Sequence, residues 1–295
     1  MTTTLPVSTE QLQQIAKQIR KEIILMLTAS GSGHPGGSLS MVEMITALFF
    51  SAMKHDPKNP KWEDRDRFIL SKGHGCPAVY AAMAMTGYFP KELLLTLRKL
   101  GSPLQGHPDT RFMPALEACT GSLGQGLSIA CGIALAARMD NKDTWTYCLT
   151  SDGESEEGQV WEAAGFAGFH KMDHLIALLD YNKFQLDGPV KNILDPEPFK
   201  AKWEAFRWHA QEIDGHDVGQ VVEAIEKAKS VKGQPHVIIC NTIKGKGVSF
   251  MENNNYFHGV APTAEEAKAA LAEIDGDPSL SEALIVAGKI KKGGK

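Results

Sequence analysis

The chain has 295 residues, of which 43% are hydrophobic and 22% charged, and its formal net charge is −4. This composition is typical of a globular protein with a large core and gives no reason to expect a nucleic-acid partner. We expect no membrane partner, because the N-terminus lacks the pattern of a secretory signal and no apolar run reaches membrane-spanning length. The five scattered cysteines form no Cys-x-x-Cys pair, and we therefore expect a reduced, cytoplasmic protein.

The N-terminal part of the chain predicts two helices separated by a glycine-rich loop. Ser8 and Gln11 can form a capping box, and apolar residues recur at helical spacing over residues 10–29. The helix must end in residues 30–37, whose four glycines and one proline are incompatible with its continuation. A second helix is expected over about 39–53, where nearly every side chain is apolar, and we therefore expect it to be buried.

Four short apolar runs further along the chain suit buried parallel strands. The strands are expected at 68–71, 144–151, 175–180 and 236–241. A helix rich in small residues is expected directly after 72–75, and the later helices are expected at 127–139, 156–169, 217–230 and 264–274. Strand, loop and helix thus alternate, which predicts an α/β fold with a doubly wound, mostly parallel sheet and helices on both faces. We expect one domain over residues 1–295, with a C-terminal tail at 276–295.

An acidic turn after one strand and an asparagine after the next give the first indication of chemistry. Asp152 and Gly153 follow the run 144–151, and Asn182 follows the next run, 182 − 152 = 30 residues later. Parallel strands joined by a helix would place both side chains at the sheet edge where such folds bind ligands. With a nearby backbone carbonyl they form an all-oxygen set that suits Mg²⁺. Alone, the same residues are also common in turns and caps.

Four of the ten histidines lie in or beside loops rich in glycine or proline. These are His34 in Ser-Gly-His-Pro-Gly, His74 in Lys-Gly-His-Gly, His107 in Gly-His-Pro and His258 in Phe-His-Gly. Glycine lets the backbone approach a ligand closely, which a histidine that serves only packing does not require. Each one alone could equally be structural. Four together suggest a polar substrate channel in which imidazoles bind hydroxyls or move protons.

Two further segments are open to more than one interpretation. The stretch Thr120-Gly121-Ser122-Leu123-Gly124-Gln125-Gly126 precedes a helix, where backbone N–H groups can bind a diphosphate, but glycines needed for close helix packing would look the same. Several carboxylates surround the Asp152 turn, and acidic residues favour a first helical turn in any protein. Their number near a metal and diphosphate site also suggests a shared proton or a subunit contact. They are Glu154, Glu156, Glu157 and Glu162.

Together these motifs resemble the diphosphate-binding half of the transketolases, which are thiamine diphosphate enzymes. The resemblance covers about residues 10–262 and rests on the order of the motifs. They are Ser-Gly-His-Pro-Gly, Asp-Arg-Phe-Ile-Leu-Ser-Lys-Gly-His-Gly, Gly-His-Pro, Thr-Gly-Ser-Leu-Gly-Gln-Gly, Ser-Asp-Gly-Glu, Asp-Gly-His-Asp and a late His-Gly. Residues 242–252 are most similar to the split transketolases, in which two chains supply what one usually holds. The resemblance implies transfer of a two-carbon ketol unit from a ketose phosphate to an aldose phosphate.

The resemblance also assigns roles to individual residues. The implied ligands of Mg²⁺, or of Ca²⁺ or Mn²⁺ in its place, are Asp152, the Asn182 side chain and the Phe184 backbone carbonyl. The implied contacts of thiamine diphosphate are His74, Gly121, Ser122, Leu123, Asp152, Gly153, Glu157, Asn182 and His258. The histidines implied to contact the donor ketose and assist its proton transfers are His34, His107 and His258. Glu157 and Glu162 match acidic positions that link neighbouring active sites across a dimer.

Some features depart from the family pattern. Ser151 stands where the metal motif usually has glycine, and Phe184 replaces a smaller apolar residue. The family also activates its cofactor with a glutamate on a pyrimidine-binding domain that follows this region. We therefore expect half an active site, completed by a C-terminal subunit that carries that domain, in an α₂β₂ assembly. The alternatives are an α-type chain of a 2-oxo acid dehydrogenase, which does not need these histidines, and a non-catalytic chain that binds a cofactor or partner.

Overall fold

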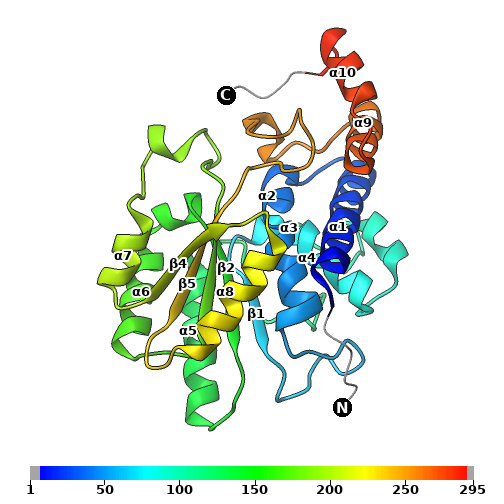
Figure 1. Ribbon diagram of the computed structural model, residues 1–295. Coiled ribbons are helices and arrows are strands. Elements are labelled where there is room, and N and C mark those ends of the chain that lie inside the picture. Colours follow the sequence, from blue (N-terminus) through cyan, green and yellow to red (C-terminus); the bar gives the residue numbers. More distant parts are fainter. Residues whose placement is uncertain (1–6, 291–295) are drawn as a thin grey trace.

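A five-stranded sheet forms the centre of the computed structural model, which describes residues 7–290 (Figure 1). The strands are β1 (Arg67–Leu70), β2 (Thr146–Ser151), β3 (Leu175–Tyr181), β4 (His209–Asp214) and β5 (His236–Asn241). Their spatial order is β1-β2-β3-β5-β4, and all neighbouring strands are parallel. Because the strands are parallel and in register, the loops after them meet at one edge of the sheet.

Helices cover both faces of this sheet, as expected for a doubly wound fold. Successive side chains of a strand point to opposite faces, and Leu149 and Leu178 accordingly belong to one apolar core while Cys148 and Ala177 belong to the other. The helices of the first core are α1 (Thr9–Ser30), α2 (Pro35–Ser40), α3 (Val42–Ala47), α4 (Cys76–Thr86), α8 (Val218–Ser230), α9 (Ala264–Asp275) and α10 (Ser279–Val286). Those of the second are α5 (Gln125–Met139), α6 (Gly158–Phe169) and α7 (Phe199–Ala205).

Of the two helices predicted near the N-terminus, the structure confirms the first and contradicts the second. The capping box of Ser8 and Gln11 opens α1, and this helix ends at Ser30 before the glycine-rich loop. The expected single helix over 39–53 is wrong. The chain instead forms α2, which begins at Pro35, then α3, and then a π-helical turn. Met41, with φ of −102°, separates α2 from α3. An all-apolar stretch contains no stop signal that would reveal this break.

Three elements were absent from the sequence-based description. Strand β4 lies at the sheet edge and α7 precedes it. Helix α10 packs on α9, in the segment where only a tail was expected, and residues 291–295 of that tail lie outside the described residues. In the described part of the chain, no helix is long and apolar enough to cross a membrane. All five cysteines are free thiols.

Candidate functional site

Asp152 and Asn182 meet at the carboxyl edge of the sheet, as their spacing predicts. Asp152 follows β2 and Asn182 follows β3, and these strands pair in register. Both side chains are buried. The Asp152 carboxylate accepts hydrogen bonds from the backbone N–H of Gly153, 2.9 Å from Oδ1, and from that of Lys183, 2.5 Å from Oδ2. The carboxylate is therefore held against the segment that begins at Asn182.

The Phe184 carbonyl lies in the same small region. A Cβ built on Gly153 would lie 3.6 Å from that oxygen and only 2.7 Å from Cβ of Gln185, so glycine permits this close approach of the two loops. Lys183 has a left-handed φ of 72°. The chain turns there, and the backbone N–H of Phe184 donates to Asn182 Oδ1 at 3.1 Å. The three oxygen donors suggested by the sequence thus come together.

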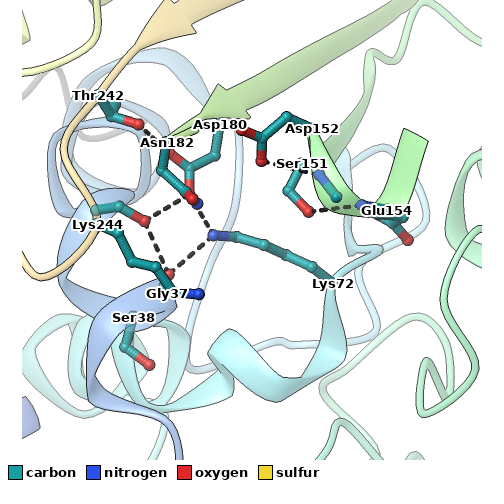
Figure 2. A network of polar contacts seen from close by, with 12 residues as sticks. Gly37, Ser38, Lys72, Ser151, Asp152, Glu154, Asp180, Asn182, Thr242 and Lys244 are labelled. Atoms are coloured by element: carbon teal, nitrogen blue, oxygen red, sulfur yellow. Dashed lines mark hydrogen bonds and ion pairs between the residues drawn. The ribbon is translucent and has the colours of Figure 1, made fainter. Parts of the chain in front are cut away.

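A buried network centred on Asp180 includes Asn182 and lies next to Asp152 (Figure 2). Asp180 Oδ2 accepts hydrogen bonds from Ser40 Oγ at 2.5 Å and from Asn182 Nδ2 at 3.0 Å, and it forms an ion pair with Lys72. Oδ1 accepts from the Thr242 hydroxyl. The bond from Nδ2 fixes the Asn182 amide so that its Oδ1 is turned away from Asp180. The charge of Lys72 holds the pKa of Asp180 below its usual range despite complete burial.

The four loop histidines form one cluster. The His34 ring centroid lies 5.2 Å from that of His74, 5.6 Å from that of His258 and 6.2 Å from that of His107. All four line a cavity of about 370 Å³ that Asn182 and other residues of the sheet edge also line. Burial lowers the pKa of each ring, to about 4 for His34 and to about 3 for His258. The cluster therefore consists of neutral imidazoles at pH 7.

Part of the glycine-rich stretch 120–126 packs closely against the loop after β1, and another part lines the cavity. A Cβ on Gly126 would lie 2.4 Å from Ser71 Oγ, and one on Gly73 would lie 2.0 Å from the Thr120 carbonyl oxygen, so these glycines serve close packing. Gly121 and Leu123, in contrast, line the cavity. The backbone N–H of Gly124, at the start of α5, donates to Glu154 at 2.7 Å.

The remaining predicted residues differ in whether they line the cavity. Glu157 lines it, although its side chain is exposed. Ser122 is exposed and is not among the lining residues, although both of its chain neighbours are. Glu162 lies on the exposed surface of α6 and does not line the cavity. The structure therefore brings together every predicted cofactor and substrate residue except Ser122, while Asp152 itself lies just beneath the cavity wall.

Comparison with known proteins agrees with this geometry. The family model "Transketolase, thiamine diphosphate binding domain" matches residues 11–284. The chain belongs to the transketolase family. The 6-deoxy-6-sulfo-D-fructose transketolase subunit SqwG of Clostridium sp. (strain MSTE9) is 52% identical to it, over 90% of this chain and 96% of the relative. An apulose-4-phosphate transketolase subunit of Actinobacillus succinogenes is 41% identical, over 90% and 97%.

Solved transketolase structures share the fold. A transketolase of Pichia stipitis superposes with a TM-score of 0.86 at 32% identity and covers 92% of this chain, which spans 41% of that protein. A transketolase of Leishmania mexicana gives 0.84 at 34% identity, over 91% of this chain and 42% of that protein. The predicted fold and family resemblance are confirmed. The alternatives, a 2-oxo acid dehydrogenase chain and a non-catalytic chain, are not favoured by these relatives.

The edge residues of this transketolase chain fit a divalent cation. Burial, and then the charge of Asp180, raise the pKa of Asp152 to about 7. Within residues 7–290 no cationic side chain pairs with the Asp152 carboxylate, which accepts only backbone N–H bonds. A bound cation would compensate such a buried charge. Carboxylate, amide and carbonyl oxygens are also the donor types that Mg²⁺ takes from proteins.

Two lysines of the site were missed by sequence reasoning. Lys72 Nζ donates to the Gly37 carbonyl at 2.8 Å and pairs with Asp180. Lys244 Nζ lies 2.7 Å from His258 Nδ1, and burial lowers its pKa to about 7. Each lysine belongs to a glycine-containing loop after a strand, and that position was the available signal. Lys72 contacts residues 35 and 108 positions away, and Lys244 also donates to the Gln185 carbonyl 59 positions away, so the loop pattern alone could not reveal these lysines.

Proposed function

We propose that this chain is the N-terminal, diphosphate-binding subunit of a two-chain transketolase in the cytoplasm. The enzyme would transfer a two-carbon ketol unit from a ketose phosphate to an aldose phosphate. The observation that carries this proposal is the cavity in which four neutral histidines face the Asp152–Asn182 edge, in a chain of the transketolase family. Two relatives that match over nearly their whole length are named transketolase subunits, which supports a two-chain enzyme.

The sheet edge would hold the cofactor and its metal. Mg²⁺, or Ca²⁺ or Mn²⁺, would bind Asp152, the Asn182 amide oxygen and the Phe184 carbonyl, and the diphosphate would lie over Gly153. His74 and the turn 121–123 would contact the cofactor, whose thiazolium carbanion supplies the nucleophile for ketol transfer. Asp180 would orient the Asn182 amide for the metal, because the amide NH₂ group donates to Asp180 and the amide oxygen, which accepts one bond from the Phe184 N–H, keeps a second lone pair.

The protein groups that would act on the sugar are the remaining histidines. His34, His107 and His258 line the cavity beside the proposed cofactor site. Their lowered pKa values keep the rings neutral near pH 7, so each can bind a hydroxyl or carbonyl oxygen without placing a charge beside it. The ketose would thus be oriented by neutral hydrogen-bonding groups, and protons would move between rings and substrate oxygens.

The proposal requires a second chain. The family's activating glutamate and pyrimidine-binding domain would come from a C-terminal subunit, in an α₂β₂ assembly. Glu157 at the cavity wall and Glu162 on the exposed surface of α6 would connect neighbouring sites across this assembly. The names of the two relatives include 6-deoxy-6-sulfo-D-fructose and apulose 4-phosphate, and these two sugars are the first donors to test.

The test is ketol transfer with thiamine diphosphate and Mg²⁺, measured for this chain alone and for its mixture with a pyrimidine-domain chain encoded beside it. Activity in the mixture alone is expected. Asp152→Ala should abolish metal-dependent cofactor binding in the mixture, measured by titration calorimetry. Asp140→Ala is the matched control, because Asp140 is an exposed carboxylate at the far end of α5. Unchanged cofactor binding in Asp152→Ala would refute the metal assignment, and activity of the chain alone would refute the half-site.

A further inference from the structure

Arg98 connects two histidine-bearing loops and is not among the residues that the proposed function uses. Its Nη1 donates to Ser32 Oγ at 3.0 Å, and its Nη2 lies 3.3 Å from His34 Nδ1 and 3.4 Å from the Gly106 carbonyl oxygen. No carboxylate pairs with this half-buried guanidinium group in the described part of the chain. Its backbone adopts a left-handed φ of 59°, which is uncommon for a residue with a side chain.

The glycine of the Gly-His-Pro motif is explained by the same side chain. A Cβ built on Gly106 would lie 2.7 Å from Arg98 Nε and 2.8 Å from its Cζ. Glycine at this position therefore allows the guanidinium group to lie directly against the backbone. Next to Gly106 is His107, which lines the cavity with His34. Arg98 thus ties the loop of His34 to the loop of His107.

The contact with Arg98 determines where the proton of His34 lies. A guanidinium group has only donors, so His34 Nδ1 must accept the hydrogen bond and cannot carry a proton. Burial, followed by the charge of Arg98, lowers the pKa of His34 to about 4, so the ring is neutral at pH 7. A neutral imidazole without a proton on Nδ1 carries it on Nε2.

The second ring nitrogen is on the side of the other histidines. A Cβ built on Gly259, the residue after His258, would lie 3.7 Å from His34 Nε2. We propose that Arg98 is a positioning residue that fixes His34 as the Nε2–H tautomer, so that His34 presents a hydrogen-bond donor to a ligand oxygen. The identity of that ligand as a ketose rests on the proposed function, whereas the tautomer does not.

The tautomer can be measured directly by NMR on the full chain labelled with ¹⁵N-histidine. The His34 signals are assigned by their loss in His34→Gln. In the wild type, the long-range ¹H–¹⁵N pattern of the Nε2–H form is expected, and in Arg98→Met the Nδ1–H form should become populated. Lys99→Met is the matched control, because it removes a neighbouring exposed charge that has no contact with His34. A wild-type Nδ1–H pattern, or an unchanged pattern in Arg98→Met, would overturn the proposal.

Arg98→Lys is a second variant in case the methionine variant does not fold. It keeps the positive charge, but one ammonium group cannot reach Ser32, His34 and Gly106 together. We expect it also to populate the Nδ1–H form, and retention of the pure Nε2–H form would count against a role for the guanidinium geometry.

The assembled enzyme provides a kinetic test of the same proposal. Arg98→Met should lower kcat/KM for the ketose donor by roughly tenfold or more, as expected when an oriented hydrogen bond to substrate is lost, while Lys99→Met leaves it unchanged. The concentration of thiamine diphosphate that half-saturates the enzyme should not change in either variant. An equal loss of cofactor affinity in Arg98→Met would indicate a general structural role and refute the assignment. If the wild-type mixture transfers no ketol unit, the proposed function fails, and the NMR result still decides the tautomer.

Discussion

The buried ion pair of Lys72 and Asp180 allows a quantitative prediction. Both side chains are completely buried, and the Asp180 carboxylate accepts hydrogen bonds from three further side chains (Figure 2). Removal of one partner leaves an uncompensated charge in the core, which typically costs about 3–5 kcal/mol. We therefore expect Lys72→Met and Asp180→Asn each to lower the free energy of unfolding by about that amount at pH 7.

The double variant separates the pair interaction from other effects of the substitutions. It removes both charges, so it should be no less stable than the less stable single variant, which corresponds to a coupling energy of at least about 3 kcal/mol. The assay is urea unfolding of the full chain at pH 7, followed by tryptophan fluorescence. The pKa of Asp180 is lowered in the folded chain, so the carboxylate is ionised and stabilises the fold fully at pH 7. This stabilisation is lost only as the pH falls through the pKa that Asp180 has in the folded state.

Two results would refute this reasoning. Additive losses in the double variant would show that Lys72 and Asp180 are not energetically coupled. A single variant as stable as the wild type would show that the remaining charge is solvated, in contrast to its complete burial. Lys142→Met is the control, because Lys142 pairs with Asp64 at 2.7 Å on the exposed surface, where such a pair contributes little.

Three further predictions concern other parts of the chain. Gly73→Ala should lower stability by about 1–3 kcal/mol in urea unfolding, because the new Cβ meets the Thr120 carbonyl, whereas Gly132→Ala has open space in α5 and should be neutral or stabilising. His236 has a pKa lowered to about 4 by burial, so its contribution to stability should fall as the pH drops from about 6.5 to about 4, and His236→Gln should flatten this dependence in thermal melts. An aromatic disulfide reagent should titrate one thiol, Cys119, in the native chain and five after unfolding.

The sequence was sufficient for those parts of the fold and site that follow from local pattern. Two buried apolar strands with a helix between them place Asp152 beside Asn182, because parallel strands in register end together. Strand β4 was not predicted, and the reason is physical. It pairs only with β5, and several of its side chains are polar and partly exposed, so it lacks the continuous apolar run of a central strand.

The residues missed at the site depend on contacts between distant segments. Lys72 and Asp180 lie 108 positions apart, and only the fold shows that their side chains meet. Arg98 gave no signal, because a single arginine between two apolar segments is normally exposed. Its proximity to His34 arises from the left-handed backbone at Arg98 and the absence of a side chain at Gly106. Buried charges at a functional site thus follow from tertiary structure, not from local pattern.

The charges at the sheet edge imply that the cofactor and the cation of the proposed function bind together. Lys72 is compensated by Asp180, while the nearby carboxyl groups of Asp152 and Glu154 are both completely buried, with pKa values raised to about 7. A diphosphate placed over Gly153 would be repelled by ionised Asp152 unless a divalent cation lies between them. In the two-chain mixture, each ligand should therefore lower the half-saturating concentration of the other by the same factor, as linkage requires. Mg²⁺ titrations at several fixed concentrations of thiamine diphosphate measure this factor, and mutually independent affinities would show that the two do not share the Asp152 site.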